Sequence, residues 1–418
     1  MLFAVLLLIL IALLGAPLFT VLAASGLLIS YQTDISPDIL IIEMHRLAAS
    51  PNMMAIPLFT LAGVIMSSGG APKRLVDLFR ASFGWMPGGL AIVSIGACAF
   101  FTTFSGASGV TILALGGLLY PILINEGYRN KFTLGLLTSS GSLGLLFPPS
   151  LALLIYAIVS GVSIEKLFIA GAVPGLLLML MLAIYSFFYA RKRDIVKHEF
   201  SFPVLSRAVK NSIFDIFLPF GIIIGIFGGF VSIMEAAAVT AAYTIIVEVL
   251  IYRTINLRKQ FFTLLVETCV LFGSLLVILL VALGLTNLMI DAQLPMKLLN
   301  AIEQHISSPL QFLLLLNLFL LVVGAVMDIF SAIIVVVPLI LPIALQYGIN
   351  PIHLGIIFLA NLEIGYLTPP VGINLFIASQ RFGKPILLLF RAALPFLIIM
   401  LIWLLAVTYI PELSLWAI

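Results

Sequence analysis

Charged side chains are scarce in this sequence. Asp, Glu, Lys and Arg make up 9% of its 418 residues, whereas 63% are hydrophobic and the mean hydropathy is +1.28. This composition excludes a soluble globular domain, and the small, dispersed net charge of +3 argues against a nucleic-acid partner. At about 20 residues per spanning helix, the apolar stretches accommodate roughly ten to fourteen spans and re-entrant pieces. We therefore expect an all-α polytopic membrane protein in a lipid bilayer, without a sizeable domain outside it.

Histidine and cysteine are also scarce, which bears on enzyme chemistry. Four histidines are scattered without a metal-ligand or catalytic partner at useful spacing, namely His45, His198, His305 and His353. The sequence has no Gly-x-x-x-x-Gly-Lys loop, which argues against direct use of ATP. Cys98 and Cys269 lie in apolar runs, so we expect small buried hydrophobes and no disulfide. The sequence thus predicts a protein that is not an enzyme and has no cofactor.

The distribution of basic residues predicts the topology. Residues 1–21 are apolar and lack the basic start of a cleaved signal peptide, so we expect a retained first span. Residues 191–210 and 253–259 together hold nine of the twenty Lys and Arg residues, which places both loops in the cytoplasm. The segment between these loops must then cross the membrane an even number of times, with a turn expected at residues 228–235.

Two similar stretches interrupt hydrophobic segments, and the rest of the chain is arranged around them. The first is residues 141–150, with Pro148 and Pro149, and the second is residues 362–371, with Pro369 and Pro370. Adjacent prolines remove backbone donors and disfavour helix in the preceding residue, so the chain must unwind there. Within a bilayer, an unwound turn has to face protein or a water-filled cavity, which makes each stretch a candidate binding site. A simple proline kink is the alternative for either stretch taken alone.

The two stretches belong to an internal repeat. Adding 221 to a position in the first half carries six prolines and glycines onto the same residue type in the second half: Pro121, Gly127, Gly144, Pro148, Pro149 and Pro174. We therefore expect an N-terminal span and connection over 1–52, a first repeat over 53–190, basic loops and helices over 191–273, a second repeat over 274–411 and a tail over 412–418.

Each repeat also contains an apolar run that is interrupted by small or polar residues. In the first repeat, Ser, Thr and Gly gather at residues 102–111, between two flanks that suit the arms of a re-entrant hairpin. A tip of this kind would present carbonyl and hydroxyl oxygens, the ligands of a hard cation. Small residues at a helix crossing are an equal alternative. The second repeat has its interruption at residues 324–331.

Two acidic residues lie within apolar sequence of the second repeat. Asp328 falls in the second hairpin tip, where an uncompensated carboxylate would cost several kcal/mol, so we expect it to be paired, protonated or next to a cation. Glu363 precedes the second proline pair. It is either a cation or proton ligand or a carboxylate near a cavity mouth or subunit contact, and the second interpretation is slightly preferred.

Two pseudo-symmetric halves, each with a hairpin tip and a broken helix, are typical of a secondary transporter. Ser150 follows the first proline pair and is expected to cap the second half-helix, so that a helix N-terminus points into the membrane interior. Such ends favour an anion, while unwound carbonyls and hydroxyls favour a small cation such as Na⁺. We therefore expect an anion to be carried together with sodium.

Several segments resemble the large membrane subunit of tripartite ATP-independent periplasmic (TRAP) transporters, the DctM-like family. They cover nearly the whole chain, at residues 44–47, 55–63, 86–91, 148–150, 171–175, 235–239, 348–355 and 367–372. The resemblance implies two inverted-topology repeats in an elevator-type, sodium-coupled importer of organic acids in the bacterial inner membrane. It also implies two partners, a small four-helix membrane subunit (DctQ-like) and a periplasmic substrate-binding protein (DctP-like).

The same resemblance indicates site residues. The first hairpin motif of the family corresponds to residues 105–111, where Ala107 and Gly109 depart from the usual pattern and put one hydroxyl ligand in doubt. We place a first sodium site at Ser105, Ser108, Gly141, Ser142 and Pro148. A second sodium site is expected at Gly324, Asp328, Gly365, Thr368 and Gly372. Substrate contacts are expected at Thr103, Pro149, Ser150 and Pro370.

Two alternatives remain open at this point. One is a stand-alone sodium-coupled dicarboxylate carrier of similar architecture that works without a binding protein. The other is a non-transporting membrane scaffold, which would not require two broken helices that face a cavity.

Overall fold

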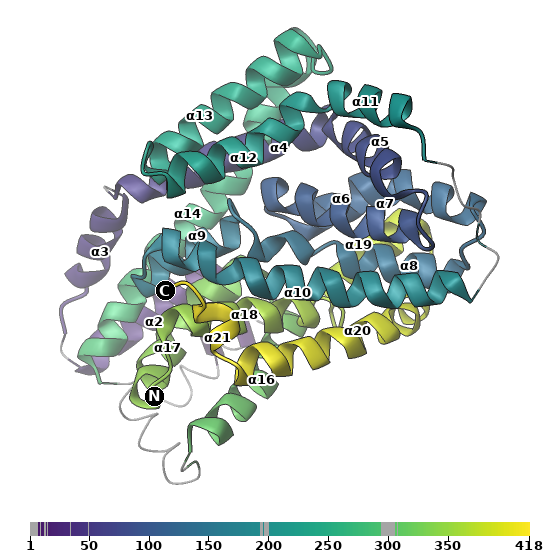
Figure 1. The fold of residues 1–418 in the computed structure, drawn as a ribbon. Coiled ribbons are helices and arrows are strands. Elements are labelled where there is room, and N and C mark those ends of the chain that lie inside the picture. Colours follow the sequence, from purple (N-terminus) through teal and green to yellow (C-terminus); the bar gives the residue numbers. More distant parts are fainter. Residues whose placement is uncertain are drawn as a thin grey trace.

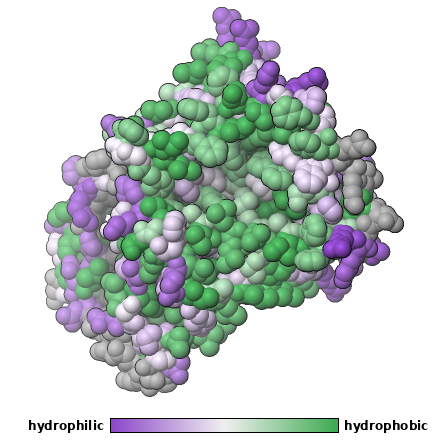
Figure 2. All heavy atoms as spheres, in the orientation of Figure 1, coloured by the Kyte–Doolittle hydropathy of each residue, from purple (hydrophilic) through white to green (hydrophobic). Residues whose placement is uncertain are grey.

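The computed structural model describes residues 7–8, 10–11, 14, 16–33, 35–48, 50–192, 195, 200–293, 306 and 308–418. Every regular element in this part of the chain is a helix. Seven helices are long and apolar enough to cross a membrane, or up to ten spans if each bent pair counts as one. Apolar side chains cover most of the face in Figure 2, with hydrophilic residues at its edges. The predicted all-α polytopic class is confirmed, whereas the predicted first span over residues 1–21 lies only partly within the described residues.

The first half of the chain consists of helices joined by short connections. It begins with α2 (Leu18–Thr33), α3 (Asp38–Ala48) and the 3₁₀ turn η1 (Pro51–Met54). The bent pair α4 (Ala55–Ser68) and α5 (Ala71–Phe83) follows, and its axes meet at 70°. The remaining elements are α6 (Gly89–Ser105), α7 (Ser108–Asn125), α8 (Asn130–Ser140), the 3₁₀ turn η2 (Leu143–Leu146), α9 (Leu151–Ser160) and α10 (Ile164–Arg191).

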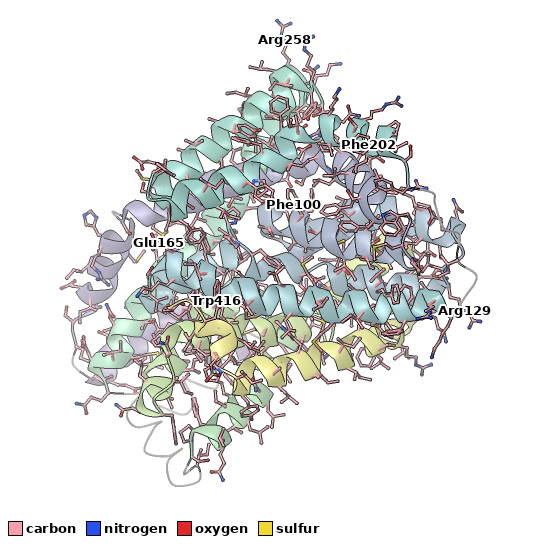
Figure 3. The ribbon with its side chains drawn as sticks, in the orientation of Figure 1. Phe100, Arg129, Glu165, Phe202, Arg258 and Trp416 are labelled. Atoms are coloured by element: carbon pink, nitrogen blue, oxygen red, sulfur yellow. The ribbon has the colours of Figure 1, made fainter. Side chains whose placement is uncertain are left out.

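The middle of the chain forms an outer layer, except for its last helix, which packs against α2, α3 and α4. It contains α11 (Phe202–Asn211), α12 (Ile213–Phe227), α13 (Ile233–Ile245), the π-helical turns η3 (Ile246–Ile251) and η4 (Leu257–Phe261), and α14 (Phe262–Asp291). The chain turns between Phe227 and Ile233, within the predicted turn, and Ser232 and Glu235 form a capping box there. Figure 1 shows α12, α13 and α4 as a band along one side of α6, α9 and α10. Phe202 and Arg258 lie at the outer edge of this layer in Figure 3.

The second half repeats the helix pattern of the first. Its elements are α16 (Pro309–Val326), α17 (Ile329–Gln346), α18 (Pro351–Gly365), α19 (Ile373–Phe382), α20 (Ile386–Tyr409) and α21 (Glu412–Leu415). Helix α7 begins at Ser108 and ends at Asn125. Helix α17 begins and ends 221 positions later, at Ile329 and Gln346. Because helix ends are set locally by prolines, glycines and caps, the equal spacing of these residues produces equal helices.

The two halves are interleaved and do not form separate domains. Helix α7 packs against α19, and its counterpart α17 packs against α9. Helices α10 and α20 run side by side (Figure 1), joined by the Trp403 Nε1–H that donates to the Pro174 carbonyl oxygen at 2.9 Å. Trp403 is fully buried, so this bond lies within the core. One arm of each hairpin therefore packs against the broken helix of the other half.

A buried ion cluster holds the bent pair α4–α5 to the middle layer. Arg74 on α5 makes two hydrogen bonds with Asp215 on α12, Nε to Oδ2 at 2.6 Å and Nη2 to Oδ1 at 2.8 Å. The same guanidinium also pairs with Glu248 in η3, whose other oxygen accepts from the Gly70 N–H at 3.2 Å. Arg74 is mostly buried and the two carboxylates almost completely so. One cation thus ties three elements together where water is excluded.

The two cysteines differ in exposure. Cys98 on α6 is fully buried, as predicted, whereas Cys269 on α14 is exposed. The prediction of a buried Cys269 was wrong because α14 turns one of its apolar faces outward, where residues such as Val266 and Val270 are also exposed. Both thiols are free.

Candidate functional site

The first hairpin tip is a two-residue break between α6 and α7. Helix α6 ends at Ser105, Gly106 takes a left-handed conformation with φ +66°, Ala107 is extended, and α7 begins at Ser108. A residue with a side chain is strained at such a φ, which explains glycine at this position. The two arms also pack against each other. The tip therefore has the hairpin geometry that the sequence predicted as one of two alternatives.

The first broken helix unwinds where the proline pair was expected to break it. Helix α8 ends at Ser140, η2 follows, Phe147 is extended, and α9 begins at Leu151 after a cis bond between Pro148 and Pro149. The Ser150 hydroxyl accepts a hydrogen bond from the Leu153 N–H at 3.4 Å and caps α9, as predicted.

The first tip contacts the first break so closely that only glycine fits between them. A Cβ atom on Gly144 would lie 2.2 Å from the Ala99 carbonyl oxygen and 2.4 Å from the Thr103 nitrogen. The Thr103 hydroxyl lies 2.9 Å from the Ala99 oxygen and 3.3 Å from the Gly144 carbonyl oxygen. The backbone of the broken helix is therefore held directly against α6.

Several uncharged oxygen atoms lie close together at this contact. We define the first oxygen cluster as the Gly141 carbonyl oxygen and the hydroxyl oxygens of Thr102, Ser105 and Thr111. The Thr102 hydroxyl oxygen lies 2.8 Å from the Gly141 carbonyl oxygen and 2.7 Å from the Thr111 hydroxyl oxygen. The Thr111 and Ser105 hydroxyls are 3.5 Å apart. The structure thus brings together Ser105 and Gly141, two residues predicted for the first sodium site. The sequence analysis did not include Thr102 and Thr111 in this site, although both lie in the predicted hairpin tip.

The other residues of the predicted first sodium site lie outside the cluster's hydrogen bonds. The Ser108 hydroxyl donates to Asn374 Oδ1 on α19 at 2.7 Å, so it joins the first tip to the second half. The Ser142 hydroxyl is fully buried and has no hydrogen-bond partner among the described residues. Pro148 is half-buried and lines an apolar cavity. Asn374 was also missed, and its place as a polar residue just after the second proline pair was the available signal.

The second hairpin tip is built around a helix-capping carboxylate. Helix α16 ends at Val326, Met327 and Asp328 are extended, and α17 begins at Ile329. The half-buried Asp328 accepts hydrogen bonds through Oδ2 from the N–H groups of Phe330 and Ser331, each at 3.0 Å. The N–H groups of a helix start favour a carboxylate, so Asp328 is compensated, as its position in apolar sequence required.

The second break repeats the close approach seen in the first. A Cβ atom on Gly365 would lie 2.4 Å from the Gly324 carbonyl carbon, so α18 and the end of α16 are in backbone contact. The Ala325 carbonyl oxygen accepts from the N–H groups of Val371 and Gly372, at 3.2 and 3.1 Å. Gly372 has φ +56°, and a Cβ atom there would lie 2.9 Å from the Thr368 carbonyl oxygen.

The residues predicted for the second sodium site therefore lie along the contact between the second hairpin tip and the second break. The Thr368 hydroxyl donates to the Ile364 carbonyl oxygen at 3.0 Å. The Ile329 N–H, next to Asp328, donates to the Tyr366 hydroxyl. Tyr366 was missed by sequence reasoning, because its role depends on the packing of the break against the tip.

The predicted substrate contacts occupy different environments. Thr103 lines an open apolar cavity of about 540 Å³, whose walls are formed by α5, α6, α10 and α12 together with Phe147 and Pro148. Phe100, labelled in Figure 3, faces the same cavity. Pro149 and Ser150 are buried, and Pro370 is exposed. Of the four, only Thr103 lines this cavity.

The environment of Glu363 differs from the one that the sequence predicted. It lies within α18 and is fully buried, and neither of its carboxylate oxygens has a hydrogen-bond partner in the described part of the chain. The preferred interpretation of a carboxylate at a cavity mouth or subunit contact was therefore wrong, because α18 is enclosed on all sides by other helices of the same chain.

Comparison with known proteins identifies the family. Residues 3–413 match the family described as "Tripartite ATP-independent periplasmic transporter, DctM component". The chain is 37% identical over 384 residues to a C4-dicarboxylate TRAP transporter large permease protein DctM of Pseudomonas aeruginosa, covering 91% of this chain and 90% of that protein. It is 34% identical over 398 residues to an isethionate TRAP transporter permease protein DctMQ of Oleidesulfovibrio alaskensis, covering 95% of this chain and 61% of that protein.

A solved structure shares the fold. The crystal structure of the YdaH transporter of Alcanivorax borkumensis matches with a TM-score of 0.63 at 14% identity, over 88% of this chain and 86% of that one. The family match and the two sequence relatives confirm the resemblance read from the sequence motifs, and they agree with the prediction that the protein is not an enzyme. The chain belongs to the tripartite ATP-independent periplasmic transporter family, as its DctM component.

Proposed function

We propose that this protein is the membrane subunit of a sodium-coupled importer of organic acids in the bacterial inner membrane. The first oxygen cluster carries the proposal, because the Thr102 hydroxyl oxygen lies 2.8 Å from the Gly141 carbonyl oxygen and 2.7 Å from the Thr111 hydroxyl oxygen. Neutral oxygens gathered where a helix unwinds suit a small hard cation. The tip–break contact around Asp328 and Thr368 is the proposed second sodium site.

The proposed substrate is a small organic anion. Helices α9 and α19 begin directly after the two proline pairs, and helix N-termini carry partial positive charge that attracts acid groups. The two relatives are named for a C4-dicarboxylate and for isethionate, a carboxylate and a sulfonate respectively. A substrate of this class would bind beside Thr103 and the helix ends, with the co-bound sodium offsetting its charge.

We further propose that the two halves are inverted-topology repeats that work by an elevator movement. The recurrence of helix bounds at an offset of 221 and the exchange of α7 and α17 between the halves support the repeats. The apolar cavity between α5 and α12 on one side and α6 and α10 on the other supports the movement. The side chains that line this cavity are almost all apolar, and an apolar boundary allows one group of helices to slide past the other.

The proposed partners are a small four-helix membrane subunit and a periplasmic substrate-binding protein. The family description names a tripartite transporter of which this chain is one component. The isethionate relative is a DctMQ protein, and this chain covers 61% of it, which leaves room for a second subunit within that protein. A periplasmic partner would require the chain to lie in the inner membrane, which supports the proposed localisation.

Uptake into proteoliposomes tests the proposal. Vesicles that contain this chain, its small subunit and its binding protein are given an inward sodium gradient and a panel of labelled organic acids. Accumulation that requires both the gradient and the binding protein is expected. Uptake without the binding protein would instead indicate a stand-alone carrier, and no sodium-dependent uptake of any acid would contradict the proposal.

One variant links this experiment to the site. Thr102→Val keeps the side-chain shape and removes the hydroxyl, so the sodium concentration for half-maximal uptake is expected to rise. Thr138→Val is the matched control, since Thr138 is equally buried but, within the described part of the chain, its hydroxyl donates only to the Leu134 carbonyl oxygen of its own helix, at 2.7 Å. Equal sodium dependence of the two variants would remove Thr102 from the proposed site.

A further inference from the structure

A second cavity lies between α5 and α11, apart from the proposed sodium and substrate residues. It is open and has a volume of about 440 Å³. The two helices pack against each other and lie next to each other in Figure 1. One wall includes Asp77 and Arg80 of α5 and Trp85 just after it, and the other includes Phe200 just before α11 and Arg207 within it. We call this space the α5–α11 cavity.

Both helices that line the α5–α11 cavity suit the surface of a membrane. Helix α5 follows the uncharged helix α4 at a bend of 70°, and α11 precedes α12, which has a single charged residue, at a bend of 64°. Helix α11 combines the charged Arg207 and Lys210 with the exposed Phe202 and Val204. Short helices that combine basic and exposed apolar residues lie in the headgroup region of a bilayer.

Two aromatic side chains beside the cavity support the same position. Trp85 is 48% exposed and Phe200 is 52% exposed, and their rings meet edge to face with centroids 6.4 Å apart. The Trp85 Nε1–H donates to the Ser82 carbonyl oxygen at 3.0 Å, which fixes the orientation of the indole. Aromatic rings concentrate where the headgroups of a bilayer meet its acyl chains. The α5–α11 cavity therefore has charged groups and an aromatic pair at the level of the lipid headgroups.

The charges of the cavity are divided between its two walls. Asp77 on α5 and Arg207 on α11 are both exposed, and neither makes a hydrogen bond or ion pair within the described part of the chain. Arg80 differs, because its Nη2 lies 2.9 Å from the Glu126 Oε1. The cavity thus offers one acid and one base to a ligand, from opposite sides.

A ligand with a phosphate and a primary ammonium group on one short linker matches this arrangement. A guanidinium group binds a phosphate through paired N–H donors, and a carboxylate accepts hydrogen bonds from an ammonium group. A purely anionic headgroup would place its charge near Asp77, and a quaternary ammonium group has no N–H to donate. We propose that the α5–α11 cavity binds the headgroup of phosphatidylethanolamine, with its phosphate at Arg207, its ammonium group at Asp77 and its upper acyl chains against Trp85 and Phe200.

Fluorescence quenching of Trp85 tests this proposal without any transport assay. The chain has three tryptophans, Trp85, Trp403 and Trp416, and the signal of Trp85 is the difference between the wild type and Trp85→Phe. The purified full-length protein in detergent is titrated with phosphatidylethanolamine that carries bromine on its acyl chains, and with phosphatidylglycerol and phosphatidylcholine labelled in the same way. Half-maximal quenching is expected at a several-fold lower mole fraction of phosphatidylethanolamine. Equal values, or a preference for either other lipid, would overturn the proposal.

Two variants separate the contacts of the headgroup. Asp77→Asn removes the partner of the ammonium group, so the preference for phosphatidylethanolamine over phosphatidylglycerol is expected to disappear. Arg207→Gln removes the partner of the phosphate and is expected to weaken the binding of all three lipids several-fold. Both residues are exposed, so neither substitution disturbs the core.

Lys210→Gln is the matched control for Arg207→Gln. Lys210 is exposed on the same helix but does not line the cavity, so its substitution should leave the quenching curves unchanged. An unchanged lipid preference in Asp77→Asn, or equal losses in Arg207→Gln and Lys210→Gln, would overturn the proposal.

Free phosphoethanolamine distinguishes a lipid from a soluble ligand. This molecule has the same two charged groups without acyl chains, so it should displace the brominated lipid only at a far higher concentration. Displacement at equal concentration would overturn the assignment to a lipid. The titration is repeated with the small membrane subunit bound, and loss of the quenching there would show that this subunit covers the cavity, which would also overturn the proposal.

Discussion

The Ser108 hydroxyl donates to Asn374 Oδ1 at 2.7 Å, across 266 positions of sequence. Ser108 begins α7 at the first hairpin tip, and Asn374 lies in the first turn of α19 after the second break. Both residues are buried, with relative exposures of 5% and 0%. The bond therefore couples the tip of one half to the broken helix of the other, where water cannot replace it.

Ser108→Ala is expected to lower the free energy of unfolding by about 1–3 kcal/mol, because it leaves a buried amide oxygen without a donor. Thermal unfolding of the purified protein in detergent measures the loss. The double variant with Asn374→Ala should lose less than the sum of the two single variants, since residues that share a hydrogen bond do not act additively. Strict additivity would show that the bond contributes nothing to stability.

Gly144→Ala is expected to disrupt the contact between the first tip and the first break. The new methyl group would lie 2.2 Å from the Ala99 carbonyl oxygen, and overpacking of this kind costs about 1–3 kcal/mol. Gly273→Ala is the matched control, because in the described part of the chain no heavy atom outside the backbone of its own helix lies within 4 Å of its added Cβ. Unfolding temperature and sodium-dependent uptake should both fall for the first variant only. Equal behaviour of the two variants would contradict the close approach.

Arg74→Ala is expected to destabilise the protein by about 3–5 kcal/mol, because the Asp215 and Glu248 carboxylates would remain buried without their cation. Arg129→Ala is the comparison. Arg129 is exposed at the edge of the molecule (Figure 3), where substitutions usually change stability by less than about 0.5 kcal/mol. Chemical unfolding in detergent measures both variants, and a similar small effect for each would argue against the buried ion cluster.

Trp403→Phe is expected to loosen the pair α10–α20. The variant removes the donor to the Pro174 carbonyl oxygen and leaves this buried acceptor unsatisfied, at a cost of about 1–3 kcal/mol. Trp416→Phe serves as the control, since Trp416 is 57% exposed at the surface (Figure 3) and its own bond to the Ile169 carbonyl is 3.4 Å long. The Trp403 variant should unfold at a lower temperature than the Trp416 variant. A lower unfolding temperature for the Trp416 variant would contradict the proposed role of the Trp403 hydrogen bond.

The sequence-based predictions that the structure confirms concern local chemistry. The membrane class follows from hydropathy, because so few charged groups leave no means of covering a soluble surface. The breaks near Pro148 and Pro369 follow from backbone donors that proline lacks, and the Ser150 cap follows from its place after the first pair. These features depend on residues within one turn of each other, so the sequence by itself determined them.

Packing between distant segments decided the rest. Thr102 meets Gly141, Arg74 meets Asp215 and Ser108 meets Asn374 only because helices far apart in sequence lie together. The burial of Glu363 has the same origin, since a glutamate in a hydrophobic run is compatible with both a cavity mouth and a closed interior. Periodicity and proline spacing show where a helix begins and ends, but the neighbours that enclose a side chain are set by tertiary contacts alone.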